Sequence, residues 1–72
     1  MNRLRVLRAE RRMSQFSLRL KTGINQSKIS FIENDLIEAT KDEKEKLAEA
    51  LEVGVEKIFG ESQIPIGATG KN

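Results

Sequence analysis

The stretch that decides the fold runs from Gln15 to Asn34 and reads QFSLRLKTGINQSKISFIEN. It holds two segments with helical spacing, separated by one glycine, Gly23. Ser14 stands just before the first segment and is a favoured N-cap residue, whereas glycine is favoured just past a helix end. We therefore expect a helix that Ser14 caps, that runs through Thr22 and that stops at Gly23.

A further helix is expected directly after this turn, over about residues 26–34. Asn25 is suited to cap its first turn, and Ile29 and Ile32 fall on one helical face. Two helices joined by so tight a turn have the spacing of a helix-turn-helix, whose second helix can lie in the major groove of DNA. The spacing alone is weakly specific, because many helical hairpins share it.

The segments on either side of this stretch also have helical spacing. One helix is expected over about residues 2–12, and another opens with a capping box of Thr40 and Glu43 and runs through Glu52. A last short helical turn is expected over residues 55–59. Five short helices without a strand pattern predict an all-α bundle. The side chains expected to face its core are Leu4, Leu7, Leu18, Ile24, Ile29, Ile32, Leu47, Ala48, Leu51, Val55, Ile58 and Phe59.

The composition changes at the end of the chain. Residues 61–72 read ESQIPIGATGKN and contain the sole proline and two of the five glycines. This segment has no helical period, so a short flexible C-terminal tail is expected. An edge strand through Ile64 and Ile66 is the alternative, although Pro65 argues against a central strand. The expected organisation is one domain over residues 1–60, followed by the tail.

The charges are unevenly distributed along the chain. The net charge is only +2, but residues 1–28 carry eight basic side chains and one acid, a net charge of +7. Residues 29–72 carry five lysines and ten acids, a net charge of −5. This separation indicates a basic face for a polyanion and an acidic remainder that keeps the domain soluble. The alternative is a set of solvated helix faces that differ in sign.

Several function classes are excluded or disfavoured by what the 72 residues lack. Without cysteine or histidine, the chain has no disulfide and no Cys/His zinc cluster. The longest wholly apolar run is two residues, so no membrane-spanning segment and no signal peptide are expected, and we predict a soluble, cytoplasmic protein. An enzyme is not expected either, because there is no histidine, cysteine or phosphate-binding glycine loop. No catalytic residue, metal or cofactor is therefore predicted.

Four segments of the chain carry a further signal, and they read LRVLRAERRMSQ, LKTGINQSKISFIEN, TKDEKEKLAEALEV and VEKIF. Through them, residues 4–59 resemble, without a gap, the phage repressor/Cro-like (XRE-type) helix-turn-helix family. The resemblance implies a five-helix bundle like that of lambda repressor, binding in the major groove of double-stranded DNA, and usually a homodimer on a palindromic site.

The resemblance also implies roles for residues at matching positions. Gln15 matches a glutamine at the start of the second helix that contacts a DNA phosphate. Arg8 and Glu33 match an ion pair between the first helix and the recognition helix. The positions that face base edges are matched by Asn25, Gln26, Ser27 and Phe31.

The helical spacing agrees on the outer face of the recognition helix. With Ile29 and Ile32 inward at about 100° per residue, Ser27, Ser30, Phe31 and Asn34 point outward, with Gln26 nearby. Gln26 is suited to read adenine, and an aromatic ring such as Phe31 is suited to lie on a thymine methyl. Lys28 lies to one side and is better placed for phosphate. The residues expected to contact the DNA backbone are Gln15, Lys28, Ser30, Arg11 and Arg12.

Each of these roles has a plainer alternative. Gln26 and Ser27 are also good first-turn helix residues, and an exposed Phe31 is equally consistent with a protein contact. Arg3, Arg5, Arg11 and Arg12 are also consistent with a solvated face. The Arg8–Glu33 pair would be structural under either reading.

The chain departs from the family pattern at several positions. Arg19 stands where a small residue, usually alanine, lets the two motif helices approach, so looser packing or an outward guanidinium is expected. Asp35 replaces the usual glycine at a turn where a left-handed backbone is expected. Residues 36–38 lack the family's phosphate-binding cations. Phe16 and Leu20 widen the apolar surface, either packing against Leu36 and Ile37 or forming a patch for a partner.

The sequence therefore predicts a sequence-specific DNA-binding transcriptional regulator, expected to be a repressor that binds a palindromic operator as a dimer. The alternative is a protein-interaction module on the same fold, such as the antitoxin of a toxin–antitoxin pair. A dimer interface is expected in the carboxy-terminal part, because the amino-terminal half is too positively charged to pack against itself. The alternative is a monomer that dimerises only on DNA. The residues expected at the interface are Val55, Ile58, Phe59, Ile64 and Ile66.

Overall fold

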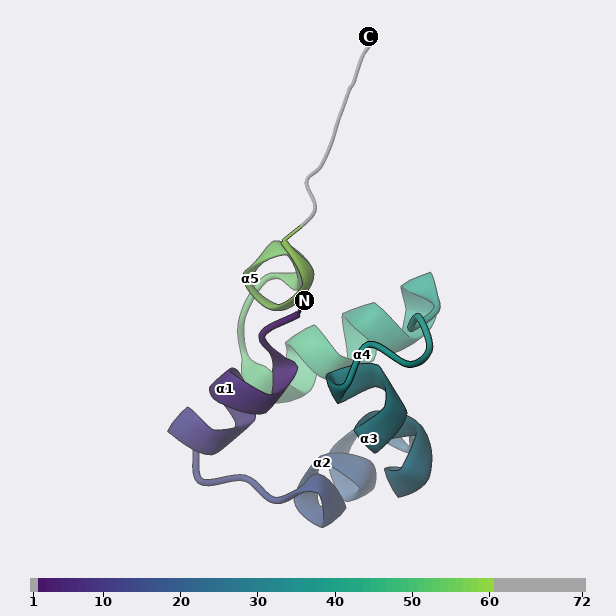
Figure 1. Cartoon of the computed structure of the whole chain (residues 1–72). Helices are drawn as coiled ribbons and strands as arrows, with labels where there is room; N and C mark the ends of the chain where they lie inside the picture. The colour runs from purple at the N-terminus through teal and green to yellow at the C-terminus, as the bar shows by residue number, and fades with distance from the viewer. Residues whose placement is uncertain (1, 61–72) are drawn as a thin grey trace, which may run out of the picture.

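The computed structural model of the protein describes residues 2–60, which form five helices (Figure 1). No strand occurs in these residues, which confirms the predicted all-α five-helix bundle. The tail and the alternative edge strand expected over residues 61–72 lie outside the described residues. The helices are α1 (Leu4–Glu10), α2 (Gln15–Thr22), α3 (Gln26–Glu33), α4 (Lys41–Leu51) and α5 (Val55–Phe59).

The starts of α2, α3 and α4 follow the predicted caps. The Ser14 hydroxyl accepts a hydrogen bond from the Ser17 amide over 3.0 Å, and the Asn25 side-chain oxygen accepts one from the Ser27 amide over 2.8 Å. At Thr40 both hydrogen bonds of the capping box with Glu43 are present. Each cap satisfies amide groups that have no partner inside the helix, which is why these local signals predict helix starts well.

The first helix is shorter than expected, because it ends at Glu10 rather than near residue 12. Arg12 takes a left-handed conformation with φ of 53°, and the Met13 amide donates to the Arg8 carbonyl over 2.9 Å. A left-handed turn of this kind usually needs glycine, so the sequence, with arginine at this position, did not predict the turn. The chain therefore leaves the helix two residues early and turns toward α2.

Two further helix ends also come one residue earlier than expected. α3 ends at Glu33, and α4 ends at Leu51, where Glu52 takes a left-handed conformation with φ of 59°. Gly23, with φ of 77°, ends α2 as predicted, and Asp35, with φ of 60°, takes the expected left-handed turn after α3.

A single apolar core joins the five helices. Val55 and Phe59, expected in the core, are only half-buried and pack against its edge, as does Met13. Ala39 is buried although the helical pattern did not include it. Burial of these side chains is the main stabilising contribution available to so small a domain. The fully or nearly buried apolar residues are Leu4, Leu7, Leu18, Ile24, Ile29, Ile32, Ala39, Leu47, Ala48, Leu51 and Ile58.

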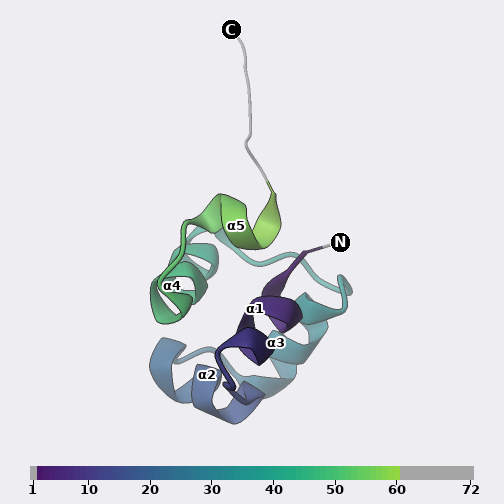
Figure 2. The same ribbon diagram turned by 90° about the vertical axis from the view of Figure 1, so that its left-hand side faces the viewer.

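The arrangement of the helices leaves α2 and α5 at opposite ends of the domain. α2 packs against α3 and α4, while α5 packs against α4 and α1 (Figures 1 and 2). The Arg3 amide, just before α1, donates to the Ile58 carbonyl of α5 over 2.7 Å. Over residues 2–60, no helix is long and apolar enough to cross a membrane.

Candidate nucleic-acid interface

The outer face of α3 carries the residues that the sequence placed there. Gln26, Ser27 and Phe31 are exposed and Ser30 is half-buried, whereas Ile29 and Ile32 lie in the core. Phe31 retains 47% of its surface exposed, an unusual state for an aromatic ring in the middle of a helix. This face therefore presents amide, hydroxyl and aromatic groups to whatever approaches α3.

Two polar side chains at the start of α3 differ in what they bond. Asn25 caps the helix, whereas Gln26 faces solvent. The Asn25 side-chain oxygen is used as the cap of the helix, which leaves its NH2 group as a donor. The Gln26 side chain makes no hydrogen bond to any other residue in the range 2–60, so both its oxygen and its NH2 group can serve a ligand.

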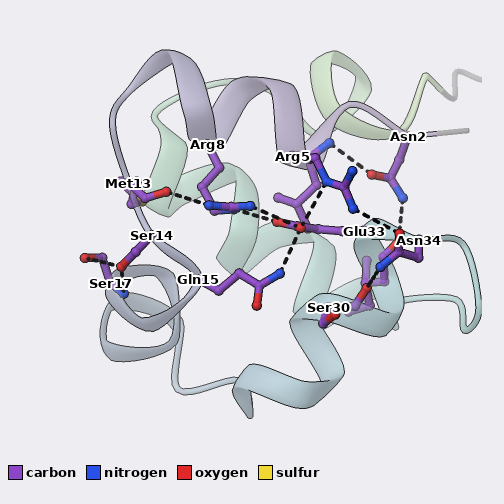
Figure 3. Close-up of polar contacts among 12 residues, drawn as sticks. Asn2, Arg5, Arg8, Met13, Ser14, Gln15, Ser17, Ser30, Glu33 and Asn34 are labelled. Carbon is purple, nitrogen blue, oxygen red and sulfur yellow. Dashed lines mark hydrogen bonds and ion pairs between the residues drawn. The ribbon is translucent and has the colours of Figure 1, made fainter.

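The Glu33 carboxylate joins α1, α2 and α3. The Arg8 guanidinium donates from Nε to Glu33 Oε2 over 2.6 Å and from Nη2 to Oε1 over 3.2 Å (Figure 3). The Gln15 side-chain amide donates to the same Oε1 over 3.0 Å. A third donor of Arg8, Nη1, bonds the Met13 carbonyl over 2.9 Å. The structure thus brings Arg8 and Glu33 together and adds Gln15, whose contact with Glu33 the sequence did not suggest.

The end of α3 is held to α1 by a second set of polar contacts. Arg5 Nη2 donates to Asn34 Oδ1 over 3.0 Å (Figure 3). The Asn2 side chain donates to the Ile32 carbonyl over 2.7 Å and to Asp35 Oδ1 over 3.0 Å. Sequence reasoning did not predict these contacts. The one available signal was that Arg5 lies three residues before Arg8, on the same face of a helix.

Lys28 is engaged with α4. Its Nζ lies 2.5 Å from Glu43 Oε2, in an ion pair that joins the recognition helix to the start of α4. This hydrogen bond from Lys28 is the main reason why the pKa of Glu43 lies below its ordinary value, and the Thr40 amide adds to the effect. The phosphate contact expected of Lys28 therefore competes with Glu43, a partner that no pattern in the sequence indicated.

The comparison with known families agrees with this geometry. Residues 3–60 match the model of the Cro/C1-type HTH DNA-binding domain. The chain belongs to this family. The resemblance stated from the sequence is thereby confirmed, and membership in the Cro/C1-type family implies DNA binding. No curated protein sequence matches the chain.

Two arginines of this Cro/C1-type domain lie between α1 and α2. Arg11 and Arg12 are both exposed, and they precede Gln15 in the chain by only a few residues. Arg11 Nη1 lies 3.9 Å from Glu10 Oε1, and Arg12 has no acidic partner among the described residues. The turn therefore carries positive charge beside the start of α2.

The departures from the Cro/C1-type pattern are accommodated at the surface. Arg19 is exposed, as expected, and its guanidinium lies 5.5 Å from the centre of the Phe16 ring. Phe16 and Leu20 keep 53% and 64% of their surface exposed, and Leu36 and Ile37 are exposed as well. The two apolar pairs are thus not buried against each other.

Proposed function

We propose that this Cro/C1-type domain is a sequence-specific transcriptional regulator that inserts α3 into the major groove of DNA and acts as a repressor. One observation carries the proposal: Gln26, Ser27 and Phe31 stand outward on α3 while Glu33, on the inner side, is bonded to α1 and α2. The reading side chains are therefore presented on a helix whose orientation is fixed, which specific recognition needs.

The proposed DNA contacts are of two kinds, those that read base edges and those that position the protein on the DNA backbone. Gln26 has an amide that can pair with adenine, and Ser27 a hydroxyl that can donate or accept. Gln15, at the start of α2, is held near α3 by its hydrogen bond to Glu33 and keeps a second side-chain N–H that can donate to a phosphate. Lys28 contacts phosphate only after leaving Glu43. The proposed base contacts are Asn25, Gln26, Ser27 and Phe31, and the proposed backbone contacts are Gln15, Lys28, Ser30, Arg11 and Arg12.

The proposal includes a homodimer on a palindromic operator. One recognition helix reads only a few base pairs, so two copies would present α3 in successive major grooves about 34 Å apart. We propose the end of the domain around α5, away from α2, as the joining surface (Figure 2). Ile58 is buried in the core and is unsuited to this role, whereas Val55 and Phe59 are half-buried. Ile64 and Ile66, also expected there, lie outside the described residues.

The role of the last residues has a direct test. We propose residues 1–60 as the DNA-binding domain and residues 61–72 as a tail that contributes to association. Sedimentation should show that deleting residues 61–72 shifts the monomer–dimer equilibrium toward monomer. An unchanged equilibrium would leave the interface to residues 50–60 or to assembly on DNA.

The function itself is tested by selection from a random pool of duplex DNA with the full chain. We expect enrichment of one sequence arranged as an inverted repeat. Failure to enrich any sequence at low salt would contradict sequence-specific binding. Such a regulator acts where the DNA is, so the proposal includes a cytoplasmic location.

The second candidate is a protein-interaction module such as an antitoxin, and the exposed Phe16 and Leu20 favour it. An apolar pair exposed on one helix is a common feature of protein-binding surfaces. The two functions can coexist on one domain, because this surface belongs to α2 and the proposed reading face belongs to α3. Binding to random duplex DNA that is weak and insensitive to salt would favour the interaction module as the main role.

A further inference from the structure

The base preference of the proposed site can be argued from which cations are available on α3. Lys28 is the only lysine or arginine between Gln26 and Glu33, and its ammonium group is paired with Glu43. Guanine is most often read in the major groove by an arginine or lysine that bonds O6 and N7. The recognition helix therefore has no arginine for this task, and its single lysine is engaged with α4.

The arginines of α1 nearest to α3 are also engaged. Arg8 donates two hydrogen bonds to Glu33 and one to the Met13 carbonyl. Arg5 bonds Asn34 at the end of α3. Moving Arg8 toward a base would leave the buried Glu33 carboxylate without its main partner, which is strongly unfavourable. Neither Arg5 nor Arg8 is therefore available to contact a guanine beside α3.

The groups that do stand on the outer face of α3 favour adenine and thymine. Gln26 carries a side-chain amide that makes no hydrogen bond within residues 2–60, and a glutamine can bond adenine N6 and N7 together. Phe31 lies one helical turn after Ser27, with 47% of its surface exposed. The thymine C5 methyl is the apolar group in the major groove that such a ring can cover. Covering it would also remove exposed aromatic surface from water.

From these observations we propose that each half-site is read at A·T base pairs, and that Phe31 determines specificity by covering a thymine methyl. This inference rests on the proposed function, because it assumes that α3 lies in the major groove. It assigns the exposed ring to DNA rather than to a partner protein.

The experiment replaces thymine by uracil, one position at a time, in the duplex enriched from the random pool. Uracil differs from thymine only by the missing methyl group, so the change tests the apolar contact alone. We expect one position in each half-site at which uracil weakens binding about fourfold, the effect of exposing one buried methyl-sized group. Phe31→Ala should bind the thymine and uracil duplexes equally, and Ser27→Ala, the matched control on the same face, should still discriminate.

The outcomes separate this inference from the proposed function. Equal binding of thymine and uracil duplexes by the unmodified protein would overturn the inference, as would discrimination that persists in Phe31→Ala. Enrichment of a half-site read mainly at G·C pairs would also overturn it. In each of these cases sequence-specific binding itself would stand, whereas the absence of any enriched sequence would contradict the proposed function. A thermal melt of Phe31→Ala close to that of the unmodified protein checks that the variant is folded.

Discussion

Arg8 on α1 donates two hydrogen bonds to Glu33 on α3, and the Glu33 side chain has no exposed surface. A buried carboxylate is tolerated only when it is paired and hydrogen-bonded, and here Gln15 supplies a further donor. The same carboxylate thus stabilises the domain and fixes α3 against the start of α2. Under the proposed function, stability and DNA recognition are therefore coupled through Glu33.

Removing Arg8 should destabilise the domain severely. Arg8→Met leaves the Glu33 charge buried without its main partner, which costs about 3–5 kcal/mol. At about 4–8 °C per kcal/mol for a domain of this size, the thermal midpoint should fall by tens of degrees or the fold should be lost.

The matched control for this variant is Arg5→Met. The Arg5 side chain is 62% exposed and lies 3.8 Å from the same carboxylate, so its removal should cost at most about 1 kcal/mol. Both variants are measured by circular dichroism during heating. An Arg8→Met midpoint equal to that of Arg5→Met would contradict the role assigned to the buried pair.

DNA affinity should depend steeply on salt. Under the proposed function, basic side chains of residues 1–28, a segment with a net charge of +7, contact DNA phosphates. A dimer that makes about six to ten such contacts should show a slope of about −5 to −9 in log K against log salt. Fluorescence anisotropy with a labelled duplex at several salt concentrations measures this slope. A flat titration would exclude phosphate contacts as a major source of affinity.

Releasing Lys28 should strengthen binding to any duplex. Glu43→Gln keeps a side-chain oxygen that can accept the hydrogen bond from the Thr40 amide in the capping box, but it removes the negative charge that holds Lys28. The freed ammonium group should add about one unit per protomer to the salt slope on random DNA.

Glu45→Gln is the matched control for this change. It makes the same change of charge two residues further along α4, at an exposed position without an ion pair in the described structure. If both variants raise affinity equally, the effect comes from net charge alone and not from Lys28.

The contribution of Glu43 to stability should depend on pH. Its hydrogen bonds with Lys28 and Thr40 lower its pKa in the folded state, so this stabilisation is present above the unfolded pKa of about 4.3 and is lost as the pH falls through the lower folded value. For a pair near the surface we expect about 0.2–1 kcal/mol. The difference in thermal midpoint between the unmodified protein and Glu43→Gln should therefore shrink between pH 6 and pH 3. A difference in thermal midpoint that grows toward acid pH would contradict the stabilising role assigned to the charged Glu43.

Much of the fold could be predicted because the helix starts are set by local chemistry. Ser14, Asn25 and Thr40 each cap a helix within three residues of themselves, and Gly23 ends one by its backbone freedom. The helix ends were less predictable. Arg12 takes a left-handed conformation that its side chain does not favour, and the turn is closed by local backbone hydrogen bonds from Arg12 to Ala9 and from Met13 to Arg8.

The candidate site, like the fold, could be predicted only in part from the sequence. The outward positions on α3 followed from helical periodicity, since Ile29 and Ile32 mark the inner face. The contacts of Gln15 with Glu33 and of Lys28 with Glu43 join residues 18 and 15 positions apart, and no local pattern encodes them. They arise only when α2, α3 and α4 pack together.

The most direct test of the account compares Gln26→Ala with Gln15→Ala on two duplexes, the enriched sequence and a scrambled version of it. If α3 reads bases, Gln26→Ala should lose about 1–3 kcal/mol on the enriched duplex and little on the scrambled one, whereas Gln15→Ala should weaken both alike. Thermal melts check that Gln15→Ala, which also removes a donor to Glu33, remains folded. Equal losses on both duplexes for Gln26→Ala would contradict the claim that the outer face of α3 reads the sequence.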